Sequence, residues 1–86
     1  MIAYTESEFR KLELSQRYKV LKEQGEYIGG RIFGSHWVYL YVLSGFFVEM
    51  WVIIAVEEIQ WIEIQSNQSI LNEYTKNIDI KKDLNL

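Results

Sequence analysis

The sequence predicts an α+β fold: an N-terminal helix, a three- to four-stranded antiparallel meander and a C-terminal helix. Three observations lead to this prediction. Residues 37–56 form an apolar run, rich in β-branched and aromatic residues, that Ser44-Gly45 divides as a hairpin turn would. A stretch of mixed charged and apolar residues precedes this run and ends at Gly25, and a second helical pattern follows it. With 86 residues, the chain is expected to form a single domain over residues 1–86.

The first helical stretch begins with a capping signal. Thr5 and Glu8 have the spacing of a capping box, which predicts that a helix starts directly after Thr5. The apolar residues that follow do not form one stripe, so we expect a loosely ordered or separately packed first turn or two within 1–13, and a firm helix over 14–24. The helix face expected to pack on the sheet carries Leu14, Tyr18 and Leu21.

Alternation of apolar and polar residues predicts the strands, and apolar residues at helical spacing predict the last helix. The expected strands cover residues 27–33, 36–43, 46–53 and 59–65. Gly29-Gly30 indicates a bulge or a close backbone approach in the first strand. The turn at 54–58 contains no Gly, Pro or Asn, so its shape stays open. A last helix, capped by Ser69, is expected to run to about residue 77, followed by a short charged tail over 79–86.

Two-residue turns fix the register of the central strands. The expected pairs are Leu43 with Phe46, Tyr41 with Val48, Tyr39 with Met50 and Trp37 with Val52. These residues share an uncharged face, which we expect to be the core, covered by the first helix and by Ile70, Leu71 and Tyr74 of the last.

The other face, which starts at Tyr27, is also mostly apolar, and its only ionisable residues are Arg31, His36 and Glu49. The register predicts a partly buried Arg31–Glu49 ion pair. A contiguous apolar face of this kind usually marks an interaction surface, and sheet-to-sheet homodimerisation is the simplest form. The candidate interface residues are Arg31, Val38, Leu40, Phe47, Glu49 and Trp51.

These patterns favour a small non-enzymatic protein that self-associates as a homodimer or binds an unknown protein partner. Two alternatives stay open. One is a small-molecule binder or minor enzyme that uses Arg31, His36 and Glu49 near an aromatic pocket. The register places His36 opposite Ile53, about two cross-strand rows from Glu49, which is too far for a direct hydrogen bond. The other is a regulatory partner of a larger protein, similar to an antitoxin or an immunity protein.

Composition argues against several function classes. No residue pattern indicates a cofactor, a metal site or a catalytic centre, and the chain has no cysteine and one histidine. The net charge of −3 lacks the basic footprint of nucleic-acid binding. The apolar run is long enough to span a membrane, but Glu49 within it would cost roughly 3 kcal/mol. No signal-peptide pattern is visible, so a cytoplasmic protein without nucleic-acid or membrane partners is expected.

Over residues 17–80 the chain resembles a set of short uncharacterised bacterial proteins. The resemblance depends on a central hairpin that reads LYVLSGFFVEMWV here, in which the Leu-Tyr, Gly-Phe-Phe-Val-Glu and Trp elements recur. Many of these relatives carry Pro or Asn in the turn after the Trp, where this chain has Ile54-Ala55-Val56-Glu57-Glu58. The resemblance implies the hairpin register and the placement of Arg31 and Glu49, and it implies no catalytic activity.

Overall fold

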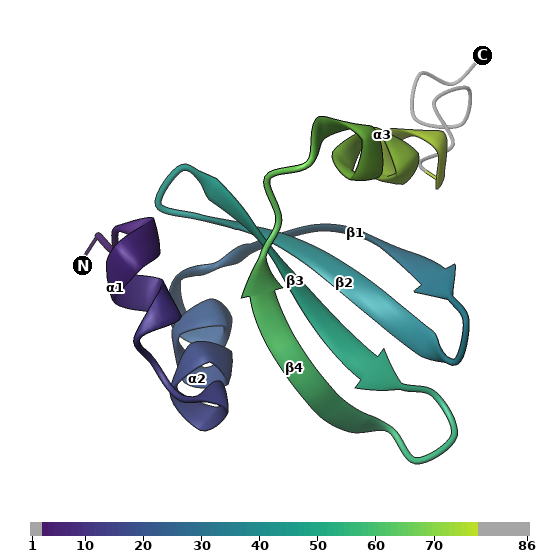
Figure 1. The fold of residues 1–86 in the computed structure, drawn as a ribbon, viewed down its shortest axis with the longest axis horizontal. Helices are drawn as coiled ribbons and strands as arrows, with labels where there is room; N and C mark the ends of the chain where they lie inside the picture. The colour runs from purple at the N-terminus through teal and green to yellow at the C-terminus, as the bar shows by residue number, and fades with distance from the viewer. Residues whose placement is uncertain (1–2, 78–86) are drawn as a thin grey trace.

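The computed structural model describes residues 3–77, and within them it contains three helices and one four-stranded sheet (Figure 1). The helices are α1 (Glu6–Arg10), α2 (Leu14–Gln24) and α3 (Gln68–Asn77), and the strands are β1 (Glu26–Phe33), β2 (His36–Leu43), β3 (Phe46–Ile53) and β4 (Glu58–Ile64). The strands pair antiparallel in the order β1-β2-β3-β4, which confirms the predicted α+β meander. The predicted tail over 79–86 lies outside the described residues.

The central hairpin has the register that its two-residue turn predicted. Leu43 pairs with Phe46, and the ladder continues without a shift to His36 and Ile53. Ser44 and Gly45 both have positive φ, at 50° and 87°, which matches the twist of a tight hairpin. The apolar run is therefore two strands. Within the described residues, no helix combines the length and the apolar character that crossing a membrane requires.

β1 carries the bulge that its two glycines indicated. Tyr27 pairs with Tyr41 and Gly29 pairs with Leu40, so Ile28 is the extra residue. The bulge moves Tyr27 to the core face, where its ring contacts Tyr41 at a centroid distance of 5.6 Å. The prediction that Tyr27 lies on the opposite face is therefore wrong, because that assignment continued strict alternation through the position of the bulge.

A second irregularity shapes the start of β4. Trp51 pairs with Trp61 and Val52 pairs with Ile59, which leaves Gln60 as the extra residue. The preceding turn contains a residue with positive φ. Because the turn has no glycine, Glu57 adopts this conformation, with a φ of 56°. β4 begins one residue earlier than predicted, at Glu58.

α1 is capped and packed. The Glu8 amide donates to Thr5 Oγ1 at 3.1 Å, and the Thr5 amide donates to Glu8 Oε1 at 2.9 Å, which confirms the capping box. Phe9 is fully buried, and its ring meets Phe46 edge-on at a centroid distance of 6.0 Å. Of the two predicted possibilities for this segment, the described residues therefore show a separately packed first helix, anchored at Phe9.

Arg17 holds the connection between α1 and α2 against the edge strand β4. Its guanidinium donates to the carbonyl of Arg10 at 2.8 Å, to that of Leu12 at 3.0 Å and to that of Ile62 in β4. The same group lies 5.5 Å from the centre of the Phe9 ring. One side chain therefore pairs backbone carbonyls from three segments.

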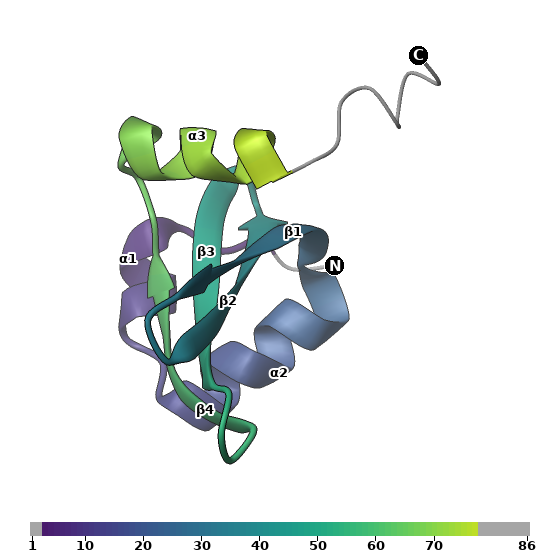
Figure 2. The same ribbon diagram turned by 90° about the vertical axis from the view of Figure 1, so that its right-hand side faces the viewer.

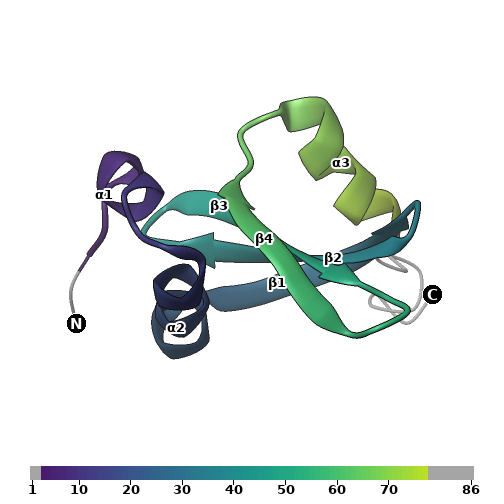
Figure 3. The same ribbon diagram turned by 60° about the horizontal axis from the view of Figure 1, so that its bottom comes forward.

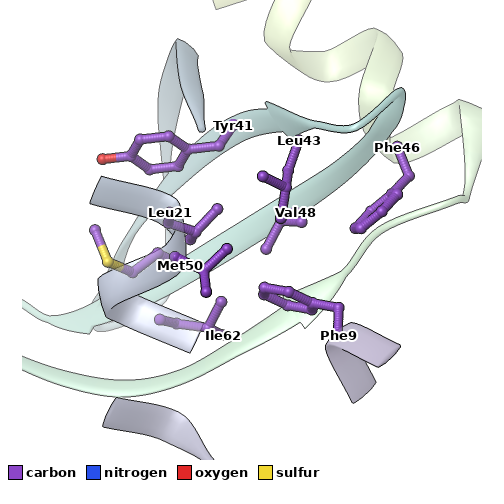
Figure 4. Close-up of a cluster of buried hydrophobic side chains, with 9 residues drawn as sticks. Phe9, Leu21, Tyr41, Leu43, Phe46, Val48, Met50 and Ile62 are labelled. Atoms are coloured by element: carbon purple, nitrogen blue, oxygen red, sulfur yellow. The ribbon is translucent and has the colours of Figure 1, made fainter. Parts of the chain in front are cut away.

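The core lies between α1 and α2 and one face of the sheet (Figure 4). Its buried members are Phe9, Val20, Leu21, Tyr41, Leu43, Phe46, Val48, Met50 and Ile62. The α2 side chains that reach this core are Val20 and Leu21. Leu14 and Tyr18, which were predicted to pack on the sheet, are each 38% exposed.

α3 lies on the other face of the sheet. It contacts β1, whereas α1 and α2 contact β4, and Figures 2 and 3 show α2 and α3 on opposite sides. The prediction that α3 covers the core face is wrong, because both faces are apolar and a helical stripe fits either. The predicted cap is also corrected: Asn67 Oδ1, and not Ser69, accepts the first amides of α3, including that of Ser69 at 2.9 Å.

Candidate functional site

A buried ion pair lies at the centre of the sheet face that α3 covers. Arg31 on β1 and Glu49 on β3 are 8% and 2% exposed, and Arg31 Nη2 lies 3.2 Å from Glu49 Oε2. The two residues are on outer and inner strands with β2 between them, so both side chains reach across Val38 and Leu40. This pair confirms the contact predicted from the hairpin register.

Glu49 receives two further hydrogen bonds. Gln65 Nε2 donates to Oε1 at 2.9 Å, and the Tyr74 hydroxyl on α3 donates to Oε2. A buried carboxylate is strongly destabilising unless such donors compensate its lost hydration. Gln65 and Tyr74 were not predicted as partners of Glu49, although a buried carboxylate needs donors, and this need was the signal that could have found them.

Arg31 is enclosed by aromatic rings. Its guanidinium carbon lies 5.4–5.7 Å from the ring centres of Phe33, Trp51 and Tyr74. Its Nη1 also lies 3.5 Å from Glu73 on α3. The cation is therefore held by two carboxylates and three π faces, and both kinds of contact favour its charged form.

The surroundings of Tyr74 and Arg31 raise the pKa of both groups and so favour their protonated forms. The pKa of the Tyr74 hydroxyl is raised well above its ordinary value, first because burial disfavours the phenolate and then because the hydroxyl donates to Glu49; Arg31 opposes this shift. The pKa of Arg31 is also raised: burial lowers it, but Tyr74 and Glu49 together outweigh that effect. The Tyr74 hydroxyl therefore stays protonated and cannot act as a base. Its hydrogen bond to Glu49 holds α3 against the sheet.

Tyr74→Phe is expected to destabilise the protein by about 1.5–3 kcal/mol, because it removes a hydrogen bond to a charged group. It should also change the response to alkaline pH. Above pH 10 the unfolded chain loses the Tyr74 proton while the folded chain keeps it, so stability falls as pH rises. Urea unfolding between pH 7 and about pH 11 should show a shallower decline for Tyr74→Phe. Tyr18→Phe, at a 38% exposed site, is the matched control and should leave both quantities unchanged.

The six candidate interface residues do not share one environment. Val38 and Leu40 are 0% and 2% exposed, so α3 and the neighbouring side chains of the same chain cover them together with Arg31 and Glu49. Phe47 and Trp51 are partly exposed. Phe47 lies beside α3, with Gln68 and Leu71 nearby, whereas Trp51 lies near the end of β3 that leads to the β3–β4 turn.

His36 is not brought to the ion pair. It lies opposite Ile53, as the register predicted, and its Nε2 hydrogen-bonds to Gln60 Oε1. The imidazole also packs against the rings of Trp51 and Trp61 at 5.5 and 5.8 Å. Gln60 reaches this position because it is the bulged residue of β4, which an unbroken alternation does not predict. The structure therefore pairs His36 with Gln60, and Arg31 with Glu49.

A shallow apolar pocket of about 210 Å³ adjoins the buried cluster, between α3 and the sheet. Its lining residues are Ile28, Leu40, Phe47, Gln68, Leu71, Asn72 and Tyr74. Within residues 3–77, no group of three His, Cys, Asp or Glu side chains is arranged to hold a metal ion. Comparisons with protein-family models, with curated proteins and with solved structures each find no match for this chain.

Proposed function

We propose that this protein is a non-enzymatic protein-binding module that self-associates through the end of the sheet where its two outer hairpin turns lie. The observation that carries the proposal is a group of large apolar side chains exposed at this end. This hairpin-end patch consists of Ile32, Phe33, Ile54 and Val56, which are 46–62% exposed; Ile32 and Phe33 are neighbours in β1, so the patch wraps around both faces at this end. The β1–β2 and β3–β4 turns that carry it lie side by side, since the Ile54 amide donates to the Ser35 carbonyl at 3.0 Å (Figure 1).

Physical reasons connect this patch to binding. Single exposed apolar residues are common, whereas a cluster of them usually marks a contact surface. A domain of 86 residues has a small core, and association is one way in which such domains gain stability. The patch also adjoins two turns that a backbone hydrogen bond joins, so little ordering is needed on binding.

The alternative, a small-molecule binder or minor enzyme that uses Arg31, His36 and Glu49, has less support. The ion pair is sealed by Tyr74, and His36 is engaged with Gln60. The pocket beside α3 has about 210 Å³, below the about 300–1,000 Å³ of most ligand sites.

Light scattering after size-exclusion chromatography tests the proposal. At tens of micromolar the wild-type protein should elute as a dimer, and Phe33→Glu or Ile54→Glu should shift it to a monomer, because each places a charge in the contact. Leu14→Glu is the matched control, since Leu14 is 38% exposed in the first turn of α2, at a distance from the patch. A wild-type monomer, or a dimer that both variants retain, would contradict the proposal.

A further inference from the structure

Four rings form a continuous surface across all four strands, on the part of the outer face that α3 leaves open. This aromatic platform consists of Phe33, His36, Trp51 and Trp61. The two indoles stack at 5.4 Å with an interplanar angle of 29°. Phe33 meets Trp51 edge-on at 5.9 Å, and His36 bridges both indoles. The platform shares only Phe33 with the hairpin-end patch, so it is a separate feature of this end of the sheet.

The rings of the platform already accept a guanidinium from the same chain. Arg31 lies 5.4 Å from the centre of Phe33 and 5.7 Å from that of Trp51. Its charge is neutralised by Glu49 and Glu73, at 3.2 and 3.5 Å. Trp61 continues the same stack, and in the described part of the chain no cation lies over its ring. Indole is the most favourable ring for a cation.

The charge around the platform is complementary to a cation. From residue 26 to residue 74 the sequence has one basic residue, Arg31, and six glutamates. Glu58 is exposed and pairs with Ile53, in the same cross-strand row as His36, and Glu57 in the adjoining turn is exposed as well. Carboxylates beside an aromatic surface attract a cation and repel an anion, which disfavours a nucleic-acid backbone.

We propose that the aromatic platform is a docking site for an arginine side chain of a basic protein segment. The guanidinium would lie against Trp61, as Arg31 lies against Trp51, and Glu58 would supply the opposite charge. Arginine fits better than an apolar residue because the stack offers π faces with carboxylates at the rim. The site supplies a binding contact for a partner and requires no self-association.

Nuclear magnetic resonance with a defined peptide tests this proposal. The probe is a capped peptide that alternates arginine and leucine, and its control is the same peptide with citrulline, an uncharged isostere, in place of arginine. The arginine peptide should shift the indole N–H signals of Trp51 and Trp61 and leave Trp37, on the opposite face, unchanged. The citrulline peptide should bind at least about tenfold more weakly. The arginine affinity should fall as ionic strength rises to about 1 M.

Variants separate this site from the proposed self-association. Ile54→Glu provides a background in which the hairpin-end patch is disrupted and the platform is intact. On that background, Trp61→Leu and Glu58→Gln should each weaken the arginine peptide, whereas Glu23→Gln, a matched loss of charge on the exposed side of α2, should not. Equal binding of both peptides, or shifts at Trp37 instead of Trp61, would overturn the arginine site without affecting the result on self-association. Binding of neither peptide would overturn it as well.

Discussion

Glu49→Ala is expected to destabilise the protein by about 3–5 kcal/mol, because it leaves the buried Arg31 guanidinium without its main counter-charge. Arg31 is 8% exposed, so water cannot replace the carboxylate without opening the contact between α3 and the sheet. The substitution also removes the acceptor of Tyr74 and Gln65. Small domains have a total stability of about 5–15 kcal/mol, so this loss can unfold much of the population.

Urea unfolding followed by tryptophan fluorescence measures this loss. Glu63→Ala is the control, because Glu63 pairs with Glu49 across the strands but is exposed. The double variant Arg31→Met/Glu49→Leu should recover most of the stability, since replacing a whole buried pair by apolar residues is often neutral or favourable. If Glu49→Ala costs no more than Glu63→Ala, the cluster does not hold α3 as described.

The sequence predicted the centre of the fold well for a physical reason. Two-residue turns with residues that tolerate positive φ leave one register for a hairpin, and alternation then assigns every side chain to a face. The Arg31–Glu49 pair followed from that register alone, although the two residues are 18 positions apart. His36 was likewise placed opposite Ile53, away from Glu49.

The errors arose in two situations. In one, an extra residue in a strand changes the alternation of side chains; in the other, a helix can pack on either of two apolar sheet faces. The bulge at Ile28 exchanged the faces of Tyr27 and its neighbour, and the bulge at Gln60 gave His36 its partner. The side that α3 covers could not be read from its apolar stripe, because both sheet faces accept such a stripe. The buried Glu49 decides between them, since it requires the Tyr74 hydroxyl as a donor.

The position of α3 also changes where a partner can bind. Five of the six interface candidates, all but Trp51, are buried within the chain or lie beside α3, and the apolar character of Val38 and Leu40 is explained by packing within the chain. Four of the most exposed large apolar residues, Ile32, Phe33, Ile54 and Val56, lie at the hairpin end. The two proposed contact surfaces are the hairpin-end patch and the aromatic platform, and their different chemistry lets two separate experiments address them.

Phe9→Ala is expected to destabilise the protein by about 3–5 kcal/mol, because it empties a fully buried ring position in the core. The ring packs edge-on against Phe46 and lies under the Arg17 guanidinium at 5.5 Å. Its loss therefore removes apolar contacts and a cation–π contact at the same point. Since Arg17 also binds the carbonyls that join α1 to α2, the damage should spread beyond α1.

Two measurements distinguish a core role for Phe9 from simple fraying of the first helix. The free energy of urea unfolding should fall by the expected amount in Phe9→Ala and change little in Leu14→Ala, whose side chain is 38% exposed. Hydrogen exchange should then show lower protection at Glu63 in β4, because its amide faces β3, Arg17 bonds to the carbonyl of the neighbouring Ile62, and α1 packs on that strand. If only residues of α1 lose protection, and stability falls by less than about 1 kcal/mol, the N-terminal segment is a loosely attached element, as its irregular apolar pattern first suggested. A loss that extends to β4 means that the short helix α1 completes the core, because the Phe9 ring fills a position that no side chain of α2 or of the sheet occupies.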